Sequence, residues 1–486
     1  MNRPLRRLSA VVAFLFFALF ASTTWIQFVR ADELNAMPGN SRQLYAEFGR
    51  ERGAILVGEN QPIATSTPVD DVYEFQREYS DAELYAHATG YYSVVYGTSG
   101  IERAANDVLS GTADRLFYRN LADLLTGAEP VGANVRLTLD PAVQRAAYDA
   151  LDGRRGAVVA LEPSTGDVLA MVSSPSYDPN RLATHDGAAA REAWASLLAD
   201  EGDPLVNRAI AGDLYPPGST FKVVTAAAAL ESGDYDTASE LFGGARLELP
   251  QTTATIGNSD GGACGAGDRV TLADAMRISC NTAFADLGMT LGQDALREQA
   301  EAFGFGQDLS IPLGVTPSSF PADLNPPQLA QSSIGQFEVR VTPLQVAMVS
   351  AAIANDGVLV QPNLIAEVRA GDGTFDVIDA PSPRELGRAV SPETARELTE
   401  IMRGVVESGT GTRAQVPGVD VAGKTGTAQA GEGAAPYAWF TSFASAGDRE
   451  VAVAVVIDNG GSSESAYGGR LAAPVAQQVM RAALGV

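Results

Sequence analysis

The chain has 486 residues and a formal net charge of −25, with 59 acidic and 34 basic residues. This length predicts two or three domains with ample material for a large core. The acidic balance argues against a nucleic-acid partner, because no basic cluster exists beyond Arg3, Arg6 and Arg7.

The N-terminus contains a membrane-length apolar run. Those three arginines precede residues 8–29, which are 22 residues without a charge and about long enough to span a bilayer. Positive charge on this flank predicts that the N-terminus lies in the cytoplasm and the rest outside the cell membrane. A cleaved signal peptide starts in the same way, but its apolar core is usually shorter, and no Ala-x-Ala site follows here. Residues 1–29 are therefore expected to form a single-pass anchor, with a signal peptide as the alternative.

Residues 30–135 are predicted to form a separate mixed domain. Short apolar segments such as 52–57 and 93–96 alternate with helical ones such as 100–109. The stretch 126–134 is rich in Gly and Pro and is typical of a linker. No pair of acids and no cluster of metal ligands stands out, so we expect a non-catalytic pedestal.

Residues 136–486 have the pattern of an α+β domain. Two apolar runs, 156–162 and 167–173, are joined by a Pro-Ser-Thr-Gly turn and predict a buried hairpin. Further strands are expected at 421–429, 439–445 and 450–457, with mostly helical patterns between the two sets. This arrangement predicts an antiparallel sheet covered by helices. Residues 362–391 are expected to be mostly loop with a short strand or two, and 430–436 to be loop throughout.

A serine at the start of a helix is the first candidate nucleophile. Ser219 follows a Pro-Pro-Gly turn and precedes the Ala-rich helical stretch 221–230. Lys222 lies three residues later, on the same helical face, so an amine is expected beside the hydroxyl. A serine activated by a lysine base needs this arrangement, although Ser-x-x-Lys also occurs by chance in many helices.

The use of lysine strengthens this interpretation. The chain contains two lysines, Lys222 and Lys424, and 32 arginines. An arginine keeps its proton in proteins, whereas a lysine can lose one when its surroundings lower its pKa. Lys424 lies in a second suggestive stretch, Gly-Lys-Thr-Gly-Thr at 423–427.

The histidines and cysteines add two expectations. His87 and His185 are the only histidines, and we expect both at the surface, which leaves no imidazole for a Ser-His-Asp triad or a zinc peptidase. Cys264 and Cys280 are the only cysteines, and outside the membrane they are expected to form a disulfide that stabilises the fold by about 3 kcal/mol. Two unrelated buried thiols are the alternative.

A third motif, Ser279-Cys280-Asn281, lies inside the apolar helical pattern of residues 272–287. Ser279 offers a hydroxyl that can pass a proton, and Asn281 an amide that can hold a peptide bond. Ser-x-Asn alone is a weak signal. The ordered set Ser-x-x-Lys, Ser-x-Asn and Lys-Thr-Gly is a strong one.

On these motifs the chain resembles the class B penicillin-binding proteins of the serine peptidase and β-lactamase superfamily, most of all their short actinobacterial members. Further stretches carry the resemblance: Arg52-Gly53-Ala54-Ile55, residues 175–180 (PSYDPN), Ile334-Gly335-Gln336 and residues 342–345 (TPLQ). One departure is residues 57–60 (VGEN), which stand where longer members carry Asp-Arg-Asn-Gly. This departure weakens inference about the pedestal only.

The resemblance implies a peptidoglycan D,D-transpeptidase without metal or cofactor. Ser219 would attack the D-Ala-D-Ala bond of a stem peptide with Lys222 as base, and Ser279 and a lysine, Lys222 or Lys424, would pass the proton to the leaving D-alanine. The oxyanion hole would be the backbone N–H groups of Ser219 and Thr427. The substrate-binding residues would be Asn281, Lys424, Thr425, Gly426 and Thr427.

The same resemblance implies partners and alternatives. β-Lactams would acylate the serine, and the partners would be a polytopic peptidoglycan polymerase and division proteins. A D,D-carboxypeptidase and a non-catalytic penicillin sensor or scaffold stay open. A bifunctional class A enzyme needs a longer N-terminal domain, and a secreted β-lactamase would be shorter and lack the anchor.

Overall fold

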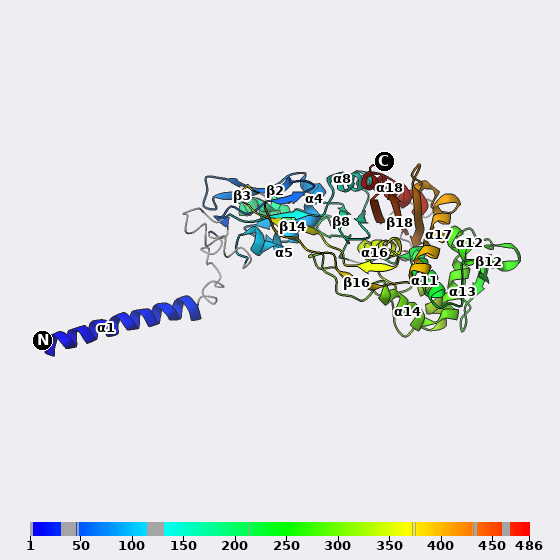
Figure 1. Cartoon of the computed structure of the whole chain (residues 1–486), viewed down its shortest axis with the longest axis horizontal. Coiled ribbons are helices and arrows are strands. Elements are labelled where there is room, and N and C mark those ends of the chain that lie inside the picture. The colour runs from blue at the N-terminus through cyan, green and yellow to red at the C-terminus, as the bar shows by residue number, and fades with distance from the viewer. Residues whose placement is uncertain are drawn as a thin grey trace.

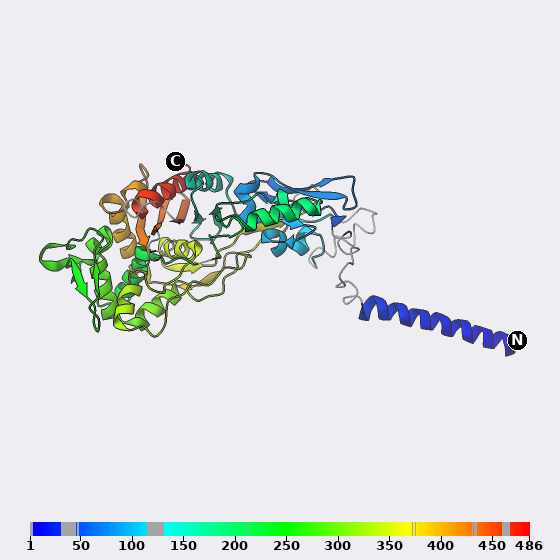
Figure 2. The same cartoon turned by 180° about the vertical axis from the view of Figure 1, so that it is seen from behind.

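The structure is a computed structural model. It describes residues 3–30, 45, 48–113, 131–212, 214–371, 373–374, 376–429, 431, 435–458 and 467–486. Part of the expected linker (126–130) and part of the expected loop (430 and 432–434) lie outside these residues. The folded part is elongated, with one α+β unit at each end (Figures 1 and 2).

The N-terminal apolar run forms one continuous helix. Its α-helical part α1 (Arg3–Thr24) continues as the π-helical turn η1 (Trp25–Val29), and all its side chains are exposed. The most apolar 18-residue window within Arg3–Val29 has a mean hydropathy of 1.9, and within the described residues this is the one helix long and apolar enough to cross a membrane. Helix α1 projects away from the folded units (Figure 1).

The larger unit is built on a five-stranded antiparallel sheet, which confirms the predicted α+β class. Its strand order is β17 (Asp420–Ala428), β18 (Tyr437–Ala446), β19 (Arg449–Ile457), β7 (Gly156–Leu161) and β8 (Val168–Ser174). The predicted hairpin at 156–173 is therefore correct, with Val158 opposite Val172. Strands from both ends of the domain meet between β19 and β7.

Helices cover both faces of this sheet. Helices α8 (Pro141–Leu151) and α18 (Gly468–Leu484) pack with Val158 and Val453 on one face. Helix α16 (Pro343–Ala354) packs with the alternate side chains, such as Val159, on the other. Because successive strand residues point to opposite faces, covering both faces explains the unbroken apolar runs in the sequence.

The segment between β8 and β17 is mainly helical. Its helices are α9 (Asn180–Ala183), α10 (Gly187–Leu198), α11 (Lys222–Glu231), α12 (Leu272–Ile278), α13 (Asn281–Leu291), α14 (Gln293–Ala302), α15 (Pro326–Ser332), α16 and α17 (Pro392–Ser408). Short strands form three two-stranded pairs: β9 (Glu240–Phe242) with β12 (Arg269–Thr271), β10 (Arg246–Glu248) with β11 (Thr255–Gly257), and β13 (Val358–Val360) with β16 (Glu385–Arg388). The 3-10 turns are η3 (Gly218–Thr220), η4 (Ala266–Asp268) and η5 (Thr412–Ala414).

The expected continuous helix over 272–287 is wrong at its centre. Helix α12 ends at Ile278, and Ser279 adopts the left-handed conformation with φ 63° and ψ 43°. A new helix, α13, begins at Asn281. The uninterrupted apolar pattern gives no sign of this break, because no Gly or Pro marks it.

The N-terminal unit has a six-stranded mixed sheet. Its order is β15 (Val377–Asp379), β14 (Ile365–Arg369), β6 (Asn134–Leu137), β1 (Ile55–Val57), β2 (Gln61–Pro68) and β3 (Phe75–Tyr79). Two of these strands come from residues 362–391, so this segment leaves the larger unit and returns to it. Helices α4 (Ala82–Thr89), α5 (Gly100–Ala104) and α6 (Asn106–Leu109) and the pair β4 (Tyr92–Ser93) and β5 (Gly97–Thr98) complete the unit.

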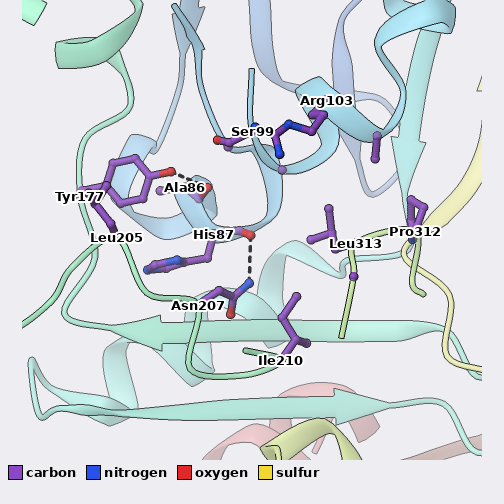
Figure 3. A pocket seen from close by; sticks show the side chains of 14 residues that line it. Ala86, His87, Ser99, Arg103, Tyr177, Leu205, Asn207, Ile210, Pro312 and Leu313 are labelled. Carbon is purple, nitrogen blue, oxygen red and sulfur yellow. Dashed lines mark hydrogen bonds between the residues drawn. The ribbon is translucent and has the colours of Figure 1, made fainter. Parts of the chain in front are cut away.

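A cavity of about 370 Å³ lies where the two units meet. Figure 3 shows His87 and Tyr177 on one side of it and Pro312 and Leu313 on the other. The Asn207 amide donates a 3.1 Å hydrogen bond to the His87 carbonyl and links the units. The expectation of a surface His87 is wrong: its ring is buried, and burial lowers its pKa to about 4.

His185 also departs from a free surface position. Its ring is mostly buried, with 11% of the side chain exposed, and its Nδ1 lies 2.6 Å from the Asp71 carboxylate.

Candidate active site

The turn before Ser219 is fixed from two sides. The Trp439 indole donates a 3.1 Å hydrogen bond to the Pro216 carbonyl, and the Gly218 N–H donates to Gly335 at 2.9 Å. Gly218 has φ +54°, and a Cβ on it would come within 2.6 Å of the Thr427 carbonyl. Glycine is therefore required here by both conformation and space. Ser219 lies in the 3-10 turn η3 that leads into α11.

Lys222 is buried behind the serine with an exposed fraction of 0%. Its Nζ lies 2.8 Å from the Ser279 carbonyl and 2.7 Å from Asn281 Oδ1. It lies 3.4 Å from Ser279 Oγ. Within the described chain, the Ser219 hydroxyl has no hydrogen-bond partner, so the amine contacts the Ser-x-Asn motif rather than the nearby serine.

Lys424 approaches the same hydroxyl from the sheet. It lies on β17 with an exposed fraction of 0%, and its Nζ donates to Ser279 Oγ at 2.8 Å and to the Thr425 carbonyl at 2.9 Å. The left-handed conformation of Ser279 brings both its hydroxyl and its carbonyl to the two amines. The structure thus joins Lys222, Ser279 and Lys424 into one chain of contacts.

The electrostatics favour loss of protons from this pair. Burial lowers the pKa of the Lys222 amine well below its ordinary value, and the positive charge of Lys424 lowers it further. Burial lowers the pKa of Lys424 to about 7. In the described part of the chain neither amine has a carboxylate partner to oppose these effects.

A cavity of about 660 Å³ opens over these residues. The predicted site residues that line it are Ser219, Ser279, Asn281, Thr425, Gly426 and Thr427. Lys222 and Lys424 do not line it, but both are fully buried and contact lining residues. Neither histidine lines it, and Tyr437 and Trp439 do not border it either; Trp439 is fully buried in the sheet.

The role of Gly426 is partly structural. A Cβ at this position would lie 2.9 Å from Trp439 Cβ and 3.0 Å from the Pro217 carbonyl. Glycine therefore lets strand β17 pack against the turn that carries Ser219. Because β17 is the edge strand of its sheet, its outer side faces the cavity.

The structure adds residues that the motifs did not identify. The Thr410 hydroxyl lies 2.6 Å from the Thr425 hydroxyl, and Asn258 contacts the start of α13. Both line the cavity. No local pattern distinguishes either residue, because each reaches the site only through tertiary packing.

The predicted disulfide is present. Cys264 and Cys280 are bonded, and no free cysteine remains. Since Cys280 is the middle residue of Ser-x-Asn, the bond ties this motif to the loop at 258–264. In the described residues, no group of three or more potential ligands could hold a metal ion.

Two family models match the chain. Residues 156–481 match the penicillin binding protein transpeptidase domain, and residues 52–135 match the penicillin binding protein A dimerisation domain.

Whole proteins are similar over the same range. The peptidoglycan D,D-transpeptidase PbpA of Mycolicibacterium smegmatis is 46% identical, covering 100% of this chain and 99% of that protein. PbpA of Mycobacterium tuberculosis is 43% identical with the same coverage. Solved structures of penicillin-binding protein A from M. tuberculosis as penicillin G and imipenem acyl-enzymes each have a TM-score of 0.85 at 43% identity, covering 90% of this chain and 100% of theirs.

Proposed function

We propose a mechanism from the premise that this chain belongs to the penicillin-binding proteins with a transpeptidase domain. The chain is a serine-type peptidoglycan D,D-transpeptidase, and β-lactams acylate it. Ser219, Lys222, Ser279 and Lys424 carry out the reaction in this mechanism. The observation that supports it is the contact chain Lys222–Ser279–Lys424 beneath Ser219.

Lys222 is the general base in this mechanism. A neutral amine has two N–H donors and one lone pair, and two strong acceptors, the Ser279 carbonyl and Asn281 Oδ1, lie at 2.8 and 2.7 Å. The lone pair is then left for a hydroxyl proton. Burial, and then the charge of Lys424, lower the pKa of Lys222 and so favour the neutral amine that a base requires.

In the acylation step the Ser219 Oγ forms a bond to the carbonyl carbon between the two terminal D-alanines. The C–N bond to the last residue breaks, and D-alanine leaves. The proton from Ser219 passes to Lys222 and then through Ser279 Oγ to the departing amine. Lys424 donates to the same hydroxyl at 2.8 Å and so orients it for this transfer.

The oxyanion is proposed to lie between the backbone N–H groups of Ser219 and Thr427. Ser219 lies at the start of a helix, and Thr427 is on the edge strand beside it. Removal of one such donor typically costs about 3 kcal/mol of transition-state stabilisation. Gly426 lets the substrate approach β17. Thr425 and Thr427 are proposed to bind the terminal carboxylate, aided by the charge of Lys424, and Asn281 the substrate amide.

The second step transfers the acyl group. An amine on a neighbouring stem peptide attacks the ester, and its nitrogen forms the new amide bond to the carbonyl carbon. The ester C–O bond to Ser219 breaks, and a proton from the attacking amine returns to the Ser219 oxygen. A β-lactam enters in the same pose, but its opened ring stays attached. The closed lysine–serine–lysine contact chain disfavours a non-catalytic scaffold, because a scaffold does not need two uncompensated buried amines.

The N-terminal helix supports a membrane location. We propose that residues 1–29 are a single-pass anchor with the N-terminus in the cytoplasm and both folded units outside. The unit formed mainly by residues 30–135 would act as a non-catalytic pedestal ahead of the transpeptidase unit, residues 136–486. A polytopic peptidoglycan polymerase and division proteins are the proposed partners in that membrane.

Intact-protein mass spectrometry tests the assignment of the nucleophile. Residues 30–486 are incubated with benzylpenicillin, with Ser219→Ala alongside. One penicilloyl adduct that persists for many minutes and is missing in the variant is expected. An adduct of equal yield on Ser219→Ala would show that Ser219 is not the nucleophile. Exchange of a labelled D-amino acid into a D-Ala-D-Ala peptide then separates transfer to amines from transfer to water, which would make the enzyme a carboxypeptidase.

A further inference from the structure

We propose that Asn258, which lies outside the three motifs, is a positioning residue that holds Asn281, and through it the Lys222 amine, in the geometry for acylation. The inference rests on the proposed function of Ser219 and Lys222. Asn258 follows strand β11 directly and is half-buried at the edge of the active-site cavity.

The Asn258 side chain caps helix α13. Its Oδ1 accepts hydrogen bonds from the N–H groups of Asn281 at 2.9 Å and Thr282 at 3.1 Å. The residue at the N-cap position, Cys280, makes no side-chain cap bond, because its sulfur is in the disulfide. The first N–H groups of a helix need such acceptors, so Asn258 supplies, from another segment, the capping oxygen that Cys280 does not provide.

The other end of the amide is held as well. Its Nδ2 donates to the carbonyls of Gly244 at 3.2 Å and Gly262 at 2.9 Å. Both N–H groups are therefore used, and the oxygen accepts two backbone bonds. A side chain with all these positions filled has one allowed orientation.

The same segment fixes the amide of Asn281. Its Nδ2 donates to the Gly257 carbonyl at 3.0 Å, and its Oδ1 accepts from Lys222 Nζ at 2.7 Å. Gly257 immediately precedes Asn258, so one short stretch orients both the backbone and the side chain of Asn281. Cys264 ties this stretch to Cys280 a second time.

This geometry gives Asn258 a route to the chemistry. The broken helix at Ser279 would leave the start of α13 free to shift, and Asn281 would move with it. Lys222 would then lose one of the two acceptors that hold its N–H groups. A misplacement of about 1 Å at a reacting group can cost on the order of 100-fold in rate.

The first test is Asn258→Ala with two readouts. Stopped-flow acylation by a chromogenic cephalosporin gives the second-order rate constant, and the final adduct stoichiometry gives the folded fraction. We expect about one adduct per molecule with a rate constant lowered about 10- to 100-fold. An acylation rate constant equal to that of the wild type, with less than one adduct per molecule, would show that Asn258 only stabilises the fold and would overturn the proposal.

The second test is Asn258→Asp, which keeps the acceptor for α13 but adds a negative charge. A carboxylate near the amine raises the pKa of Lys222, so in this variant Lys222 would be protonated, and inactive as a base, up to a higher pH than in the wild type. The groups that face Lys222 are Lys424 from β17, Ser279 and Asn281, and the Phe284 ring of α13 at 5.6 Å. Asp260, two residues after Asn258, is an acidic residue of the same segment and also lines the cavity.

We expect the ratio of the Asn258→Asp acylation rate to the wild-type rate to fall by at least about threefold from pH 8 to pH 6. An identical pH profile together with a normal rate for Asn258→Ala would refute the proposal.

Asn207→Ala is the matched control. Asn207 is also half-buried and also bridges backbone groups, but it lines the cavity between the units rather than the active site (Figure 3). Its acylation rate should equal that of the wild type. Ser219→Ala distinguishes failure of the proposed function from failure of the positioning role. If Ser219→Ala is still acylated, the proposed function is wrong. If Ser219→Ala is not acylated and Asn258→Ala is acylated at the normal rate, the positioning role alone is refuted.

Discussion

Two clusters of buried cations, one in each unit, are built in opposite ways. In the N-terminal unit, Glu102 lies between two arginines, with Arg52 Nε at 2.6 Å and Arg77 Nε at 2.7 Å. In the active site, Lys222 and Lys424 are equally buried, but within the described residues neither has an acid beside it.

The consequences for the protons are opposite. Burial alone would lower the pKa of Arg52, but the charge and hydrogen bond of Glu102, together with Tyr92 and Tyr79, outweigh burial and raise the pKa. Burial would raise the pKa of Glu102, and the charges of Arg77 and Arg52 lower it overall. In the active site burial acts unopposed, and both lysine pKa values fall. The first cluster fixes its charges, whereas the second makes protons available for transfer.

The largest expected effect, on the acylation rate, comes from replacing an active-site lysine with arginine, the cation of the N-terminal cluster. Lys222→Arg keeps a positive charge but removes the lone pair, because arginine does not deprotonate in proteins. Loss of a general base should lower the acylation rate by about 10⁴-fold. The second-order rate constant with benzylpenicillin measures it, and a near-native rate would mean that Lys222 is not the base.

The converse change removes the acid from the structural cluster. Glu102→Gln leaves Arg52 and Arg77 buried without a counter-charge, which should lower the free energy of unfolding by about 3–4 kcal/mol. Thermal and urea unfolding measure the loss. The acylation rate constant of the folded protein should stay unchanged, and a lowered rate would show that the two clusters are coupled.

The third prediction concerns stability against pH. Above pH 7 the unfolded chain holds a proton on Lys424 that the folded chain has lost, so stability rises with pH up to about 10.5. Relative to Lys424→Met, the wild type should gain about 1.4 kcal/mol per pH unit in this window. Urea unfolding at pH 7.5, 8.5 and 9.5 checks the slope; parallel curves for the two proteins would show that Lys424 is not perturbed.

The smallest effect is expected from Arg52→Lys. The guanidinium donates to the Glu102 carboxylate, the Glu102 carbonyl and Asn106 at 2.6 to 2.8 Å, and a lysine amine cannot reach all three. A loss of about 1–2 kcal/mol in unfolding free energy is expected, with unchanged acylation. A larger loss than that of Glu102→Gln would mean that geometry, rather than charge pairing, holds the cluster.

Much of the fold could be predicted because it rests on local signals. Apolar runs and turn residues predicted the hairpin at 156–173 and the three later strands, and covered faces explain why those runs do not alternate. Strands β14 and β15 could not be assigned to the N-terminal sheet, because β14 pairs with β6, more than 200 positions away in the sequence, and β15 joins the sheet only through β14.

The candidate site shows the same limit. The motifs named the residues that the structure brings together, but Ser279 breaks its helix without a Gly or Pro to signal it. The spacing of Ser219 and Lys222 did not predict that the amine contacts Ser279 and Asn281 instead. His87 is buried because two units meet over it, which composition does not reveal.

The pH dependence of acylation tests the neutral Lys222 most directly. The rate constant with benzylpenicillin is measured from pH 6 to pH 9, where the drug itself does not titrate. Since burial lowers the pKa of Lys222 well below its ordinary value, the rate should not rise from pH 7 to pH 9, and it should fall above about pH 7 as Lys424 loses its charge. A rate that rises tenfold per pH unit from pH 7 to pH 9 would show a lysine of ordinary pKa and contradict the account.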